Sequence, residues 1–277
     1  MPMNTVMHRR TALGTAAAAG CLPFISMLPR AFATEPGLQF GLPEPFSFDG
    51  LIERAHRLAI RPYIPPPTSA PEVVQQIDYD AHHKLAFRPE YALFESGPGP
   101  YPIVFRFLGM FFPKSVRMHV LESGISREIL YAPDYFTIAE DSPAWQLPPG
   151  TNGFAGFWIQ ESRFTEEQRK QEVWASFLGA AYFRAVSGVG QWGMSARGVA
   201  IDVAGPHPEE FPDFVAHWIT AAATEHDPVV VHSLLDGPSI AGAFRFAISR
   251  TTGTVMEWRS RSTFLRAGTS SAWALLR

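Results

Sequence analysis

The segment FLGAAYFRAVSGVGQWGMSARGVAID, residues 177–202, gathers side chains that could bind a carbohydrate. It places aromatic rings beside arginine, glutamine and aspartate side chains, with glycines between them. Flat aromatic rings can cover the apolar faces of pyranose rings, and the polar groups can pair with sugar hydroxyls. The competing interpretation is that part of the aromatic side chains, Phe177 and Phe183 above all, belongs to a hydrophobic core. The candidate substrate-binding residues are Tyr182, Arg184, Gln191, Trp192, Arg197 and Asp202.

Other combinations of reactive side chains give weaker evidence for a functional site. GMSARG, residues 193–198, has the wrong spacing for a G-x-S-x-G nucleophile elbow, and we interpret it as a turn that enters a strand. His82 and His83 are adjacent and could not both face one metal from a strand, so with Asp78 and Asp80 they are interpreted as a surface cluster. His217, His226 and His232 are isolated single residues. We therefore predict neither a metal site nor a cofactor, and no catalytic residue is assigned from these patterns.

The N-terminal segment has the pattern of an export signal. Arg9 and Arg10 precede the apolar run TALGTAAAAGCLPFISML, and a small-residue cleavage site follows at Ala31-Phe32-Ala33. The arginine pair favours twin-arginine export over the general secretory route, and a lipoprotein site at Cys21 is a further alternative. The run is interrupted by glycine and prolines, which argues against stable membrane insertion. We expect residues 1–33 to be a signal peptide and the mature chain to be exported.

The composition of the chain limits which fold classes and ligand classes are plausible for the part that follows the signal. The whole sequence has 277 residues, 46% of them hydrophobic, with 25 prolines and 22 glycines, which suits many short strands joined by turns. Removal of residues 1–33 would take away three arginines and no acid, so 23 basic and 26 acidic residues become 20 and 26, a formal charge of −6. An acidic exported chain is a poor candidate for nucleic-acid binding. The single cysteine, Cys21, would leave with the signal, so neither disulfides nor thiolate ligands are expected.

Hydrophobic periodicity predicts a mainly β protein. Residues 34–45 resemble a flexible leader, residues 49–60 carry a helical pattern capped by Asp49, and residues 71–76 favour a helical turn. Glu122-Ser123-Gly124 predicts a hairpin turn, and residues 211–220 fit a strand or a short helix. Patterns of period two or apolar runs predict strands at 101–109, 114–123, 126–133, 153–160, 173–186, 196–204, 227–237, 239–250 and 254–265. Strands at this spacing, without long helices between them, favour an antiparallel β-sandwich.

Several long segments of the sequence resemble one protein family. They are SFDGLIERAHRLAIRPYIPPP, FAGFWI, FLGAAYFRA, GMSARGVAID, EEFPDFVAHW and HSLLDGPSIAGAFRF, and they occur in family order from about residue 46 to about residue 265. They are similar to the periplasmic glucan biosynthesis family, called OpgG/MdoG and OpgD, and the twin-arginine leader is similar to the OpgD branch. The resemblance implies a β-sandwich of the galactose-mutarotase-like supersandwich type, spanning residues 46–265, with a glucan cleft on its concave face.

The resemblance also implies a role in making or trimming osmoregulated periplasmic glucans with a β-1,2-linked glucose backbone. Some members resemble inverting endo-β-1,2-glucanases, whose two catalytic aspartates lie downstream of the last matching word. Within the matching words, Glu209 and Glu210 are interpreted as solvated loop charges and Asp236 as a turn residue. The resemblance implies a glucan as partner and suggests contact with the inner-membrane glucan synthesis machinery. The alternative is a non-catalytic periplasmic glucan-binding or scaffold protein.

The last residues depart from the family pattern. Residues 266–277, RAGTSSAWALLR, contain no segment that matches the family pattern. With one choice of codons, the same stretch read two bases along would encode a sequence that resembles the continuation of the family. We therefore expect a truncated sandwich and hypothesise a frameshift at this point, which sequencing of the gene from the codon for Ser262 onward would test.

Overall fold

The computed structural model describes residues 37–66, 68, 70–148, 153–161, 173–186, 192–204 and 206–264, which all belong to the unit spanning residues 33–277. Residues 37–45 of the expected leader are described and contain two short strands, Gln39–Phe40 and Glu44–Pro45, that pair with residues 125–130, so the interpretation of this stretch as flexible is wrong. The expected signal peptide, residues 34–36 and the expected tail at 266–277 lie outside the described residues, as does Gln191. For those segments the expectations stay predictions.

The larger sheet of the described residues has eight strands. Its order is β1-β6-β5-β12-β13-β14-β15, and β2 also pairs with β6. All neighbours pair antiparallel except β5 and β12, which run parallel with Ala216 opposite Arg117. The strands are β1 (Gln39–Phe40), β2 (Glu44–Pro45), β5 (Arg117–Glu122), β6 (Ile125–Leu130), β12 (Asp213–Thr220), β13 (Val229–Asp236), β14 (Ile240–Arg250) and β15 (Thr254–Phe264). Residues 213–220 thus form a strand, which decides between the two alternatives for this segment.

A second sheet of five described strands is antiparallel throughout, in the order β11-β10-β9-β8-β4. It consists of β4 (Ile103–Arg106), β8 (Gly156–Gln160), β9 (Val173–Leu178), β10 (Tyr182–Val186) and β11 (Trp192–Arg197). A small third sheet pairs β3 (Leu85–Phe87) with β7 (Phe136–Ile138). The short helices are α2 (Pro71–Val74), α3 (Tyr79–His83) and the 3₁₀ helices η1 (Pro89–Tyr91), η2 (Pro133–Tyr135) and η3 (Pro143–Gln146).

Aromatic side chains join the two large sheets face to face. Phe157 of β8 and Phe177 of β9 contact the ring of His217 on β12, at centroid distances of 5.2 and 5.5 Å. Phe177 and Phe183 each lie 5.0 Å from Phe246 on β14. All of these side chains are buried, so the layer between the sheets is a hydrophobic core. The predicted antiparallel β-sandwich is confirmed, with the parallel β5–β12 pair as the one exception among the pairs of the large sheet given above.

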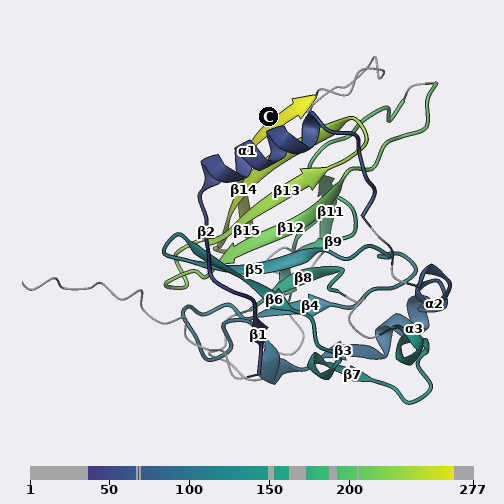
Figure 1. Cartoon of the computed structure of the whole chain (residues 1–277). Helices are drawn as coiled ribbons and strands as arrows, with labels where there is room; N and C mark the ends of the chain where they lie inside the picture. The colour runs from purple at the N-terminus through teal and green to yellow at the C-terminus, as the bar shows by residue number, and fades with distance from the viewer. Residues whose placement is uncertain are drawn as a thin grey trace, which may run out of the picture. The chain divides into compact units, whose positions relative to one another are not determined.

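The other face of the eight-stranded sheet is covered by helix α1 (Phe48–Ala59), which lies across β13, β14 and β15 (Figure 1). Its buried residues Leu51 and Ala55 share one hydrophobic cluster with Trp218 of β12 and Ala243 of β14. Three or four residues separate the apolar positions of the helix, so they form one stripe toward the sheet.

The helix cap differs from the prediction. Asp49 was expected to cap the helix, but Ser47 occupies the N-cap, and its Oγ accepts a hydrogen bond from the backbone N–H of Gly50 at 3.0 Å. Asp49 lies in the first turn instead. Ser47 has extended backbone angles, so its hydroxyl can reach the unpaired N–H groups of the first turn. Asp49 already has a helical backbone and lies inside that turn.

Replacement of the cap separates these two roles. We expect Ser47→Ala to lower the free energy of unfolding by about 1 kcal/mol, because one N–H of the helix loses its acceptor. Asp49→Ala should cost less, about 0.3–1 kcal/mol, because it removes only the favourable charge at the positive end of the helix dipole. Urea denaturation of both variants measures the difference. A larger loss for Asp49→Ala would return the capping role to Asp49.

Two strand predictions required correction, and one turn was confirmed. Residues 173–186 form two strands because Gly179 and Ala180, with φ of 77° and 42°, turn the chain between β9 and β10. The predicted strand at 196–204 is wrong beyond Arg197, where β11 ends, and only a single bridge joins Ile201 to Glu210. The predicted hairpin turn between β5 and β6 is confirmed: Ser123 and Gly124 have φ of 49° and 78°, as a two-residue turn of the type that suits twisted strands requires.

Candidate functional site

The outer face of the five-stranded sheet carries three of the candidate side chains, Tyr182, Arg184 and Arg197. Phe183 points into the core, where it contacts Phe177 and Phe246. Side chains alternate between the two faces of a strand, so Tyr182 and Arg184 point away from the core. Phe177 and Phe183 themselves are core residues, and for these two the alternative interpretation of the aromatic segment is confirmed.

Arg197 lies at the centre of one group on this face. It is opposite Tyr182 in the β10–β11 register, and its guanidinium carbon lies 5.6 Å from the centroid of the Tyr182 ring and 5.1 Å from that of Phe211. Its Nη2 lies 2.5 Å from Oε1 of Glu209. Glu209 is therefore an ion-pair partner, and its interpretation as a solvated loop charge is wrong. The Arg197 side chain is only 18% exposed, so the two rings and the carboxylate hold it in place.

Arg184 and Ser195 form the next pair along the same strands. They are opposite each other in the register, and both Nε and Nη2 of Arg184 donate to Oγ of Ser195, at 2.8 and 2.5 Å. Ser195 therefore lies within β11, and the interpretation of GMSARG as a turn entering a strand is wrong. Its hydroxyl serves as an acceptor that orients the arginine.

Trp158 and Arg106 extend the face, and sequence reasoning missed both. Trp158 is opposite Ser176, which is opposite Arg184, so the three side chains lie in one row across β8, β9 and β10. The guanidinium carbon of Arg106 lies 4.0 Å from the centroid of the Trp158 ring, at stacking distance. The signal for Trp158 was present in the sequence, since it stands between Phe157 and Ile159, whose side chains point to the core.

His82 approaches Arg106 from α3. Its Nε2 lies 3.0 Å from the carbonyl oxygen of Phe107, so Nε2 carries the proton, and Nδ1, 3.5 Å from Nη2 of Arg106, accepts. Burial, with the Arg106 charge as a smaller contribution, lowers the pKa of His82 and favours this neutral form. The interpretation of His82 as a chance surface residue is wrong, whereas the exposed His83 only packs on the ring of Tyr79. Burial also lowers the pKa of Arg106, to about 10, which leaves it charged at neutral pH.

A pocket of about 200 Å³ adjoins Arg106 and Trp158. Tyr79 and Phe111 on its rim are 65% and 63% exposed, which is unusual for large aromatic side chains. Leu178 of β9 lines the pocket as well. We refer to Arg106, Trp158, Tyr182, Arg184 and Arg197 together as the aromatic–arginine face. It offers flat rings and fork-shaped donors on one surface of one sheet.

The remaining candidates are not part of this arrangement. Asp202 lies in a turn beyond the end of β11, with a left-handed φ of 55°. Trp192 begins β11, but its side chain lies outside the described part, as does the whole of Gln191. For these two residues the binding role stays a prediction.

Two further carboxylates have structural partners. Oε1 of Glu210 accepts a hydrogen bond from the backbone N–H of Ser239 at 3.0 Å, so Glu210 is not simply a solvated charge. Asp236 is buried and ends β13 opposite Asp213, which corrects its interpretation as a turn residue. Within the described ranges, no group of three or more histidine, cysteine, aspartate or glutamate side chains could hold a metal ion. No helix in the same ranges is long and apolar enough to span a membrane.

Comparison with known proteins identifies relatives for most of the chain. A family model described as "Periplasmic glucan biosynthesis protein, MdoG" matches residues 46–271. The chain is 45% identical over 257 residues to glucans biosynthesis protein D 2 of Ralstonia nicotianae, covering 91% of this chain and 48% of that protein. It is 38% identical over 253 residues to glucans biosynthesis protein D of Xanthomonas oryzae pv. oryzae, covering 90% and 46%. The chain thus spans about half the length of the curated relatives it matches.

Proposed function

Because this chain belongs to the family of periplasmic glucan biosynthesis proteins, MdoG, we propose that it binds a glucan on the aromatic–arginine face and acts in periplasmic glucan biosynthesis. The ligand we propose is a chain of β-1,2-linked glucose, and the proposed location is the periplasm. Contact with the inner-membrane glucan synthesis machinery stays a prediction.

The observation that carries this proposal is the pairing of each ring on the face with an arginine. Trp158 stacks under Arg106, and Tyr182 lies beside Arg197. A ring held in this way offers a preorganised apolar platform for a pyranose, and the neighbouring guanidinium groups are donors for its hydroxyls. Ion pairing to Glu209 fixes Arg197 further, which lowers the entropy lost when a ligand binds.

We assign to the described residues the binding and orientation of the glucan. Inverting hydrolysis needs an acid and a base carboxylate about 6.5–9.5 Å apart on opposite sides of the scissile bond. Among the described residues, Glu209 is a carboxylate that contacts this face, and it is in an ion pair with Arg197. That pairing favours the second candidate function, a glucan-binding or scaffold protein that does not cleave. Incubation of the purified chain with glucan distinguishes the two, since only an enzyme releases short oligomers.

Substitution of the platform tests the binding proposal. We expect Trp158→Ala to weaken the binding of linear β-1,2-glucan at least about tenfold, equivalent to about 1.4 kcal/mol, because the stacking surface for one sugar ring is lost. Isothermal titration calorimetry measures the dissociation constant, and unfolding of each variant is followed in parallel.

The matched control is Trp145→Ala. Trp145 lies on η3, is 60% exposed, and does not belong to the aromatic–arginine face. We expect this variant to bind like the unchanged protein. If Trp158→Ala is folded and binds the glucan as tightly as Trp145→Ala, the aromatic–arginine face is not the binding site.

A further inference from the structure

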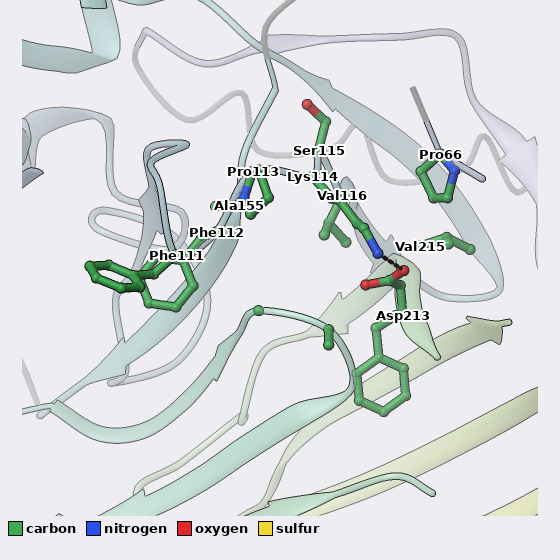
Figure 2. Close-up of a pocket in the computed structure, with 13 residues that line it drawn as sticks. Pro66, Phe111, Phe112, Pro113, Lys114, Ser115, Val116, Ala155, Asp213 and Val215 are labelled. Carbon is green, nitrogen blue, oxygen red and sulfur yellow. Dashed lines mark hydrogen bonds and ion pairs between the residues drawn. The ribbon is translucent and has the colours of Figure 1, made fainter. Parts of the chain in front are cut away.

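A second pocket, of about 210 Å³, shares Phe111 and Phe112 with the first but has a different polar group (Figure 2). Pro66 and Pro113 contribute further apolar walls. Figure 2 shows the ammonium group of Lys114 and the carboxylate of Asp213 pointing at each other within this frame. The pocket therefore combines mainly apolar walls with one ion pair.

The ion pair is short, and its carboxylate is withdrawn from water. Nζ of Lys114 donates to Oδ2 of Asp213 at 2.6 Å, and the two side chains are 38% and 5% exposed. Burial raises the pKa of Asp213, although the hydrogen bond and charge of Lys114 act in the opposite direction. The loss of hydration thus outweighs the ion pair at Asp213. An ion pair with a buried carboxylate is often no more stable than apolar residues of similar volume, so packing alone gives no reason for it here.

Contacts of the β9–β10 turn hold two walls of this pocket together. Gly179, at φ +77°, brings the β9–β10 turn so close to the Phe112 ring that an added Cβ would lie 2.9 Å from it. The backbone N–H of Phe214, next to Asp213 on β12, donates to the carbonyl of Ala180 in that turn at 3.2 Å. The turn therefore ties Phe112 on one wall to the strand that carries Asp213.

We propose that this pocket binds one neutral sugar ring, with Lys114 and Asp213 contacting its hydroxyl groups and the phenylalanine and proline side chains covering its apolar faces. The choice of a sugar rests on the proposed function, because this pocket shares Phe111 with the pocket that adjoins Arg106 and Trp158 and could take a residue of the same glucan. A hydroxyl group both donates and accepts, so neighbouring hydroxyls of one ring satisfy the carboxylate and the ammonium group together.

The charge of the pair selects against charged ligands. An anionic sugar could pair with the Lys114 ammonium group, and a cationic sugar with the Asp213 carboxylate, only at the cost of separating a 2.6 Å ion pair. The pocket volume of about 210 Å³ is of the order of one hexose rather than a chain of them.

The test uses free D-glucose as the probe, with glucosamine and glucose 6-phosphate as cationic and anionic comparators. We expect saturable glucose binding in ligand-observed NMR titrations of the full chain, and at least about tenfold weaker binding in Lys114→Met and Asp213→Asn. Lys114 is partly exposed, so Lys114→Met decides the question if Asp213→Asn does not fold. Glucose binding that is absent, or unchanged in folded Lys114→Met, overturns the proposal, and tighter binding of either charged comparator overturns the preference for a neutral ring.

Comparison with Trp158→Ala separates this inference from the proposed function. If both hold, Trp158→Ala weakens the long glucan and leaves free glucose unaffected, while Lys114→Met weakens glucose. If only the pocket fails, Trp158→Ala still weakens the glucan, and Lys114→Met has no effect on glucose. If only the aromatic–arginine face fails, glucose still depends on Lys114, but the glucan is insensitive to Trp158→Ala.

Discussion

Acidification from pH 7 to pH 5 is expected to lower the free energy of unfolding of this chain by several kcal/mol, because three buried histidines are held neutral. Burial lowers the pKa of His217 to about 3 and the pKa values of His119 and His232 to about 4 each. His217 lies in the core between the sheets, where its Nδ1 is 2.7 Å from Oγ of Ser233. His119 stacks on Trp218 at 4.7 Å, on the face that helix α1 covers.

The direction of the effect follows from proton uptake by the unfolded chain. In that state each histidine has a pKa of about 6.5. Below this pH the unfolded chain binds protons that the folded chain does not, so stability falls from about pH 6.5 down to the folded pKa values and does not recover below them. Each histidine contributes a slope of about 1.4 kcal/mol per pH unit, or about 4 kcal/mol per unit for all three. The total stability of a typical protein is only about 5–15 kcal/mol.

Neighbouring charges modify this slope in a predictable way. Arg117 and Arg54 oppose protonation of His119, while Glu128 favours it, and Arg245 opposes protonation of His232. The raised pKa of Asp213 acts in the opposite sense, because the folded state takes up that proton more readily than the unfolded state. It offsets part of the loss only as the pH approaches the range in which carboxyl groups titrate.

Urea denaturation at pH 7, 6 and 5 measures the slope. His232→Gln removes one of the three groups, and we expect the slope to fall by about one third whatever the variant does to stability at pH 7. The control is His226→Gln, because the side chain of His226 is 87% exposed and lies outside the core. Equal slopes in the unchanged chain, His232→Gln and His226→Gln would show that these histidines do not govern acid stability.

The fold was largely predictable because strand periodicity is local. Alternation in residues 239–250 and 254–265 identified β14 and β15 almost to their ends, and the turn at Ser123-Gly124 was visible in the sequence. The predicted strand boundaries were wrong where the backbone bends without a change in the hydrophobic pattern of the sequence. The break at Gly179-Ala180 lies inside a continuous apolar run, and the end of β11 at Arg197 precedes residues that are themselves apolar.

The site was only partly predictable because a sheet face is assembled from distant strands. One hairpin carries Tyr182, Arg184 and Arg197, so a single segment of the sequence was enough to predict them as candidates. Trp158 and Arg106 reach the same face through pairing of β4, β8 and β9, which no local pattern reveals. Long-range pairing likewise gave Glu209 and the histidines on β12 and β13 roles that isolated residues in a sequence do not suggest.

Removal of the Phe177 ring is expected to cost about 3–5 kcal/mol of stability, the range for a large aromatic side chain lost from a core. Phe177 is 1% exposed and stacks on Phe157 at 5.0 Å, with the rings 12° apart. It also contacts Phe214 and Phe246 of the opposite sheet. Removal of the ring would therefore leave a cavity between the two sheets. The loss is large against the total stability of a domain.

The same substitution links the core to the proposed binding face. Phe177 and Phe183 are opposite each other in the β9–β10 register, and the outward neighbours of Phe183 are Tyr182 and Arg184. Phe177→Ala should therefore lower the denaturation midpoint and weaken glucan binding together, whereas Phe177→Leu, which fills most of the volume, should lose less of both. Leu42→Ala is the control, since Leu42 is 86% exposed. If Phe177→Ala unfolds at the same urea concentration as Leu42→Ala, the aromatic layer does not hold the two sheets together, and the binding face must be positioned by other contacts.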